Sequence, residues 1–124
     1  MSYSAVEQYK TQTINSMTNG ELLILLFDEV IKNLKIACTM LEEKNYAISE
    51  KCTQKAKEII HYLINILDRQ YPLSQELYQM YSFFNEKIIS AEIKQDPKIL
   101  EEITPLIEDM RQTWVEANRL THIK

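Results

Sequence analysis

The feature that most constrains this chain is a helix-start signature at residues 18–21 followed at once by six apolar residues, 22–27. Thr18 can accept a hydrogen bond from the backbone N–H of Glu21, and Glu21 can reach back to the N–H of Thr18. Each residue of a helix turns by about 100°, so six apolar residues in a row cover every face. A helix with one buried stripe does not need that pattern. Residues 22–27 are therefore either buried on all sides within this protein or partly exposed for binding to a partner.

The scarcity of turn residues favours a few long helices. The chain has 124 residues, which is enough for one domain with one core, and 45 % of them are hydrophobic, as in a globular protein. It contains a single glycine, Gly20, and three prolines. Sheet proteins need many turns, and turns consume Gly and Pro.

Apolar residues at helical spacing predict four helices, over about 21–43, 46–70, 74–94 and from 97 onward. Short connections between them predict an all-α, antiparallel up-down four-helix bundle. We expect the bundle domain to span residues 18–124 and residues 1–17 to form a mobile arm. The core is expected to include Leu26, Phe84, Met110 and Trp114.

Local signals set the expected helix ends. Pro72 should stop the second helix at about residue 70, because the residue before a proline is pushed out of the helical region. Ser74 is the expected N-cap of the third helix. Asp96 should cap the fourth helix, with Pro97 at its first position. Pro105 predicts a kink or break near residues 103–104.

Charge and composition exclude several classes of partner. The net charge of −4 and the lack of a basic stripe argue against nucleic-acid binding. The longest apolar run is far shorter than a membrane span. The first residues do not resemble an export signal, so we expect a cytoplasmic protein in which Cys38 and Cys52 are reduced and buried.

We find no pattern typical of an enzyme, a cofactor site or a metal site. Glu58 and His61 have the Glu-x-x-His spacing of di-metal bundles, but such a site needs two of these motifs and two further carboxylates. Helical geometry places both residues away from the apolar stripe, facing water. Neither cysteine has a nearby histidine, and the chain has no glycine-rich phosphate loop.

A surplus of apolar residues on the second and third helices is the remaining signal. These residues lie to one side of the main stripes, and they are Ile60, Ile64, Tyr78, Ile89 and Ile93. As antiparallel neighbours, the two helices could line a hydrophobic groove with them. The alternative is that they form the flank of a broad core. Exposed patches of this kind usually mark interaction sites.

Two groups of residues resemble the FliS family of flagellar export chaperones. The N-terminal group is Tyr9, Ile14, Thr18-Asn19-Gly20-Glu21-Leu22 and Leu25-Leu26-Phe27-Asp28. The C-terminal group is residues 77–81, 91–96, Leu100 and 110–114. The resemblance covers nearly the whole chain. The chain departs from the family pattern at Asn19, where proline is usual, at Phe27, where tyrosine is usual, and at Glu92, where asparagine is common.

The resemblance implies a cytoplasmic, non-enzymatic chaperone that binds the disordered C-terminal region of flagellin. It would block premature polymerisation, keep flagellin competent for type III export and help it dock at the export gate. The five apolar residues of the expected groove would then contact flagellin, and an arm around Tyr9 and Ile14 would partly cover the groove when it is empty. Two other hypotheses remain: a homodimeric structural bundle without a client, and a small metal-binding bundle enzyme.

Overall fold

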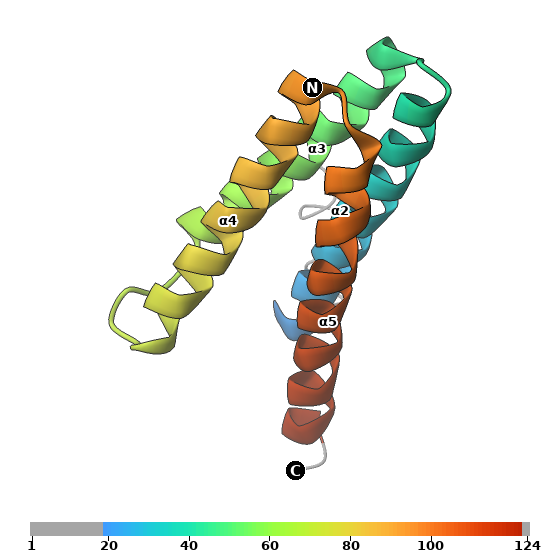
Figure 1. The fold of residues 1–124 in the computed structure, drawn as a ribbon. Helices are drawn as coiled ribbons and strands as arrows, with labels where there is room; N and C mark the ends of the chain where they lie inside the picture. Colours follow the sequence, from blue (N-terminus) through green and yellow to red (C-terminus); the bar gives the residue numbers. More distant parts are fainter. Residues whose placement is uncertain (1–18, 123–124) are drawn as a thin grey trace.

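The computed structural model describes residues 19–122, which form four helices: α2 (Asn19–Glu42), α3 (Tyr46–Asn65), α4 (Leu73–Lys94) and α5 (Pro97–His122). They run alternately up and down, as Figure 1 shows. The predicted all-α bundle is confirmed. Thr18, and with it half of the predicted capping box, lies outside the described residues.

Helix α2 holds the bundle together. It packs extensively against α3 on one side and α5 on the other, whereas α4 makes smaller contacts with α3 and α5. Near the α4–α5 turn these two helices lie close, and toward the opposite end of the bundle they diverge (Figure 1). α4 is therefore the least enclosed of the four helices.

The width of the apolar arc on α2 explains its central position. Its buried hydrophobic residues are Leu22, Leu26, Phe27, Val30, Ile31, Leu34, Ala37 and Leu41. Phe27 lies next to Tyr81 of α4, with ring centroids 6.2 Å apart. Leu26 and Phe84 are core residues, as predicted, while Met110 and Trp114 are half-buried and pack against the core. Burying one such large aliphatic or aromatic side chain contributes roughly 1.5–3 kcal/mol.

Helix α3 ends at Asn65, about five residues before the predicted end. The carboxylate of Asp68 accepts a hydrogen bond from the backbone N–H of Gln70 at 3.0 Å, and the Asp68 carbonyl accepts one from Tyr71 at 3.2 Å. This aspartate turn competes with helical hydrogen bonding before Pro72 is reached. The prediction that Ser74 caps α4 is also wrong. Pro72 occupies the cap position without a side-chain hydrogen bond, and Ser74 is buried inside the helix.

Helix α5 starts as predicted but is not interrupted. The Asp96 carboxylate accepts a hydrogen bond from the backbone N–H of Lys98 at 3.0 Å, and Pro97 is the first helical residue. The expected break at Pro105 does not occur, because the helix continues through it to His122. The Pro105 ring is exposed, whereas Ile103 and Ile107 on the inner face are buried, so packing holds the backbone helical.

Two helix ends adopt the left-handed conformation without glycine. Lys44, after α2, has φ of 60°, and Gln95, after α4, has φ of 50°. Glycine is the usual residue at such positions. The single glycine, Gly20, lies instead inside α2, where a Cβ atom would come within 2.3 Å of Asn118 Oδ1. It lets the start of α2 approach the end of α5.

Among the helices of residues 19–122, none combines the length and the apolar character needed to span a lipid bilayer.

Tyr81 should make stability fall at alkaline pH. The side chain is 2 % exposed, and burial raises its pKa from 10.0 to about 12. The folded state therefore favours the neutral phenol, and this stabilisation is present below pH 10 and is lost as the pH rises toward 12. We expect Tyr81→Phe to remove about 2 kcal/mol of the alkaline loss of stability.

Urea unfolding at several pH values between 8 and 12 measures this difference. Tyr71→Phe is the matched control, because Tyr71 is 65 % exposed. Equal alkaline losses in the wild type and in Tyr81→Phe would contradict the prediction.

Candidate protein-binding groove

A surface groove follows the seam between α3 and α4. Its larger part has a volume of about 570 Å³ and lies nearer the α3–α4 loop. The residues that line it are Gln54, Lys57, Glu58, His61 and Ile64 of α3, and Tyr78, Ser82, Asn85, Glu86 and Ile89 of α4. Three of the five predicted groove residues, Ile64, Tyr78 and Ile89, thus lie in one depression.

A second hollow continues the seam toward the opposite end of the bundle. It has a volume of about 290 Å³ and includes Leu41, Tyr46 and Ile93 in its wall. Gln54 and Lys57 line both hollows. The two hollows therefore adjoin along the seam, and together we call them the α3–α4 groove.

The predicted groove residues differ in solvent exposure, and only the exposed ones can contact a partner. Ile64 is half-buried, Tyr78 and Ile89 are 37 % and 44 % exposed, and Ile93 is 78 % exposed. Ile60 is only 2 % exposed and belongs to the core, because α3 is covered by α2 and α4 over a wide arc. For this residue the alternative of a broad core is correct. Tyr9 and Ile14 lie outside the described residues.

The polar residues of the α3–α4 groove were not among the predicted site residues. On α3 they are Gln54, Lys57, Glu58 and His61, and on α4 they are Ser82, Asn85 and Glu86. The α3 set has the spacing i, i+3, i+4, i+7, which places four side chains on one helical face. Ile89 completes the same spacing on α4. This spacing is visible in the sequence, but by itself it predicts only that Glu58 and His61 face solvent.

An ion pair crosses the α3–α4 groove where its two hollows join. Lys57 Nζ lies 2.7 Å from Glu92 Oε1, and Thr53 Oγ1 donates a hydrogen bond to Glu92 Oε2 at 2.6 Å. The two charged side chains are 23 % and 20 % exposed, so solvent screens the pair only in part. Apolar side chains therefore lie in both hollows, on either side of the ion pair, among the more numerous polar residues of the wall.

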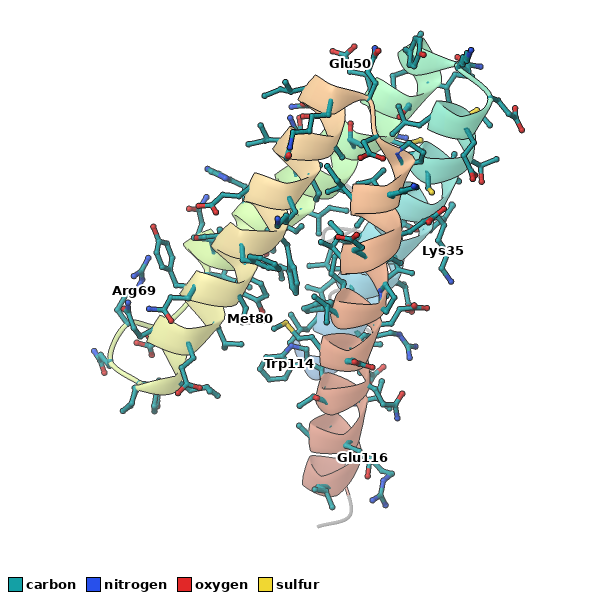
Figure 2. The ribbon with its side chains drawn as sticks, in the orientation of Figure 1. Lys35, Glu50, Arg69, Met80, Trp114 and Glu116 are labelled. Atoms are coloured by element: carbon teal, nitrogen blue, oxygen red, sulfur yellow. The ribbon has the colours of Figure 1, made fainter. Side chains whose placement is uncertain are left out.

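Further apolar side chains lie where α4 and α5 diverge. Met80 and Phe83 of α4 are 38 % and 37 % exposed, and Trp114 of α5 is half-buried. Figure 2 shows Met80 and Trp114 on facing sides of the space between the two helices. Near the α3–α4 loop, the Arg69 guanidinium lies 4.6 Å from the centre of the Tyr78 ring and covers one face of it.

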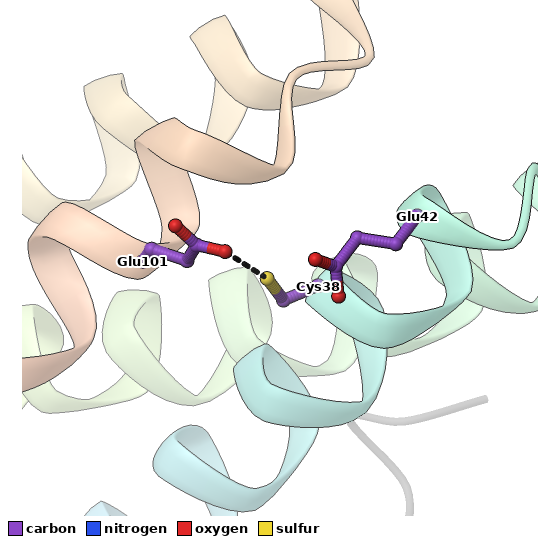
Figure 3. A group of neighbouring side chains, drawn as sticks. All are labelled: Cys38, Glu42 and Glu101. Atoms are coloured by element: carbon purple, nitrogen blue, oxygen red, sulfur yellow. Dashed lines mark hydrogen bonds between the residues drawn. The ribbon is translucent and has the colours of Figure 1, made fainter.

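One cluster of possible metal ligands lies away from the α3–α4 groove. Figure 3 shows Cys38 and Glu42 of α2 beside Glu101 of α5. Within residues 19–122, their ligand atoms lie within 4.8 Å of one another, and the cluster does not include Glu58 or His61. The Cys38 thiol donates weakly to the Pro97 carbonyl at 3.6 Å and to Glu101 Oε1 at 3.8 Å. The prediction of two buried cysteines holds for Cys52 but not for Cys38, which is half-buried.

Cys38 should react slowly with thiol reagents. Its burial, followed by the charges of Glu42 and Glu101, raises the pKa of the thiol from 9.0 to about 11. At pH 8 this reduces the thiolate fraction, and with it the alkylation rate, about 100-fold relative to an unperturbed cysteine. Peptide-resolved mass spectrometry after timed iodoacetamide treatment measures the rate. Substituting both Glu42→Gln and Glu101→Gln should increase it, whereas an unchanged rate would show that the carboxylates have no influence.

Comparison with known proteins identifies the family of the chain. The family model described as flagellar protein FliS matches residues 2–121. The flagellar secretion chaperone FliS of Bacillus subtilis (strain 168) is 28 % identical over 109 residues, which cover 88 % of this chain and 82 % of that protein. The protein of the same name from Escherichia coli (strain K12) is 25 % identical over 107 residues, covering 84 % of this chain and 79 % of its own. The chain thus belongs to the FliS family of flagellar secretion chaperones.

Proposed function

We propose that this protein is a cytoplasmic export chaperone that binds the disordered C-terminal region of flagellin. By covering that region it prevents premature polymerisation and keeps the subunit competent for type III export, and it acts by binding alone, without catalysis. Family membership supports the role of an export chaperone. The resemblance set out above supports flagellin as the client and the export gate as a further contact.

The observation that carries this proposal is an open groove in which partly exposed apolar side chains lie beside a buried core. Ile64, Tyr78 and Ile89 are partly exposed in one depression, while Ile60 and Ile88 beneath them are buried. An amphipathic segment that folds into such a groove buries its apolar face there, and this burial offsets the cost of ordering the segment. The resulting moderate affinity suits a client that must later be released.

The competing function is a structural module that pairs through the same face with a second copy of the chain. A permanent dimer would cover the partly exposed residues of the α3–α4 groove and leave no room for a client. Sedimentation at several protein concentrations separates the two functions, since a chaperone awaiting its client keeps this face free.

Calorimetric titration with a peptide from the C-terminal region of the same organism's flagellin tests the proposal. We expect saturable one-to-one binding with a negative heat-capacity change, as for coupled folding into an apolar site. Ile64→Asp should abolish binding with unchanged helix content, because it places a charge in the groove. Ile36→Asp is the matched control, since Ile36 is 37 % exposed on α2 and does not line the groove.

Absence of binding to the well-folded wild type would overturn the flagellin assignment. Unchanged binding by Ile64→Asp would mean that the α3–α4 groove is not the binding site, and loss of binding by Ile36→Asp as well would mean that the effect is not specific to the groove.

Deletion of residues 1–15 tests whether the N-terminal arm regulates access. If the arm around Tyr9 and Ile14 competes with the client for the groove, its removal should strengthen binding of the same peptide. The measurement is the ratio of the two dissociation constants by calorimetry. Equal or weaker binding by the shortened chain would argue against a covering role.

A further inference from the structure

The Lys57–Glu92 ion pair lies where the two hollows of the α3–α4 groove adjoin, and each hollow has apolar side chains in its wall. Toward the α3–α4 loop the wall contains Tyr78 and Ile89, and toward the other end it contains Leu41 and Ile93. Lys57 lines both hollows. A segment lying along the whole groove must therefore pass over this pair.

The pair keeps hydrogen-bonding capacity for a partner. Each oxygen of Glu92 already accepts one hydrogen bond, from Lys57 and from Thr53, and each retains a lone pair. The Lys57 ammonium has three N–H donors, and Glu92 takes one of them. An occupied groove would exclude the water that otherwise satisfies the remaining donors and lone pairs. A buried polar group left without a partner is costly, more so when it is charged.

We infer, on the basis of the proposed function, that the Lys57–Glu92 pair fixes the register of the bound segment by recognising a side-chain amide. An asparagine or glutamine carries a separate oxygen and NH₂ group, so it can accept from Lys57 and donate to Glu92 at the same time. The segment then places apolar residues in the hollows on both sides of that amide.

Other side chains satisfy the pair less well. A leucine leaves the remaining N–H donors of Lys57 and the remaining lone pairs of Glu92 without a partner. A lysine or a glutamate is attracted by one member of the pair and repelled by the other, so it adds a net charge to a site that the bound segment closes off from water. A hydroxyl can also donate to Glu92 and accept from Lys57, but it offers one hydrogen where the amide NH₂ group offers two. The pair therefore disfavours registers that place an apolar or charged residue at the crossing.

A peptide scan in two protein backgrounds tests this inference. Each asparagine and glutamine of the flagellin C-terminal peptide is replaced in turn by leucine, and dissociation constants are measured for the wild type and for Lys57→Met/Glu92→Leu. In that variant the Thr53 hydroxyl can donate its hydrogen to the Glu50 carbonyl, which lies 3.1 Å away. Replacing an ion pair by apolar residues often leaves stability unchanged, and circular dichroism melting verifies that the variant is folded.

We expect one position at which leucine weakens binding to the wild type about tenfold, the loss that corresponds to one unsatisfied buried polar group. In Lys57→Met/Glu92→Leu this penalty should disappear or reverse. The matched control is Lys35→Met/Glu108→Leu, which removes the exposed 3.2 Å ion pair between α2 and α5, outside the groove, and should keep the wild-type preference.

The possible failures can be told apart. One outcome is that the wild type binds the peptide while each leucine substitution weakens binding equally in the wild type and in Lys57→Met/Glu92→Leu. In that case the ion pair does not recognise an amide of the segment, and the proposed function stands. If lysine or glutamate at the sensitive position binds more tightly than the amide, the site recognises charge, and the inference is wrong. If the wild type binds none of the peptides, both the inference and the proposed function fail.

Discussion

The breadth of the apolar surface on α2 is the constraint on which the rest of the structure depends. Residues Leu22, Leu26 and Phe27 are all buried, and no single neighbouring helix covers an arc of that width. Helices α3 and α5 therefore both pack extensively against α2, and α4 completes the bundle through smaller contacts with these two. The seam between α3 and α4 is consequently shallow at the surface, and its apolar residues stay partly exposed.

Features that depend on neighbouring residues in the sequence, such as helix positions, could be predicted from the sequence. Features that depend on packing between helices could not. Helical spacing and the Asp96-Pro97 start predicted the four elements and their order. Pro105 looked like a break because its effect on an isolated helix is unfavourable, but buried neighbours on both sides keep α5 continuous. The early end of α3 depends on the Asp68 side chain, a local signal that was present in the sequence and was outweighed by Pro72.

The candidate site likewise has residues that could be predicted from the sequence and residues that could not. The apolar residues of the groove were predictable from their spacing, except that Ile60 falls on the core side of a boundary set by the position of α4. The ion pair between the two hollows was not predictable. Lys57 and Glu92 are 35 residues apart in sequence, and only the antiparallel register of α3 and α4 brings them within 2.7 Å. Nothing in either helix alone marks them as partners.

The limited packing of α4 against its neighbours has a consequence for the dynamics of the bundle. Local opening free energies in a protein vary with the amount of packing that must be broken, so α4 is the helix that detaches at the lowest cost. A ligand that contacts α3 and α4 together binds only while α4 is in place, and it therefore raises the free energy of that opening. Occupancy of the groove would thus appear as slower amide hydrogen exchange along the whole of α4, including turns that the ligand never touches.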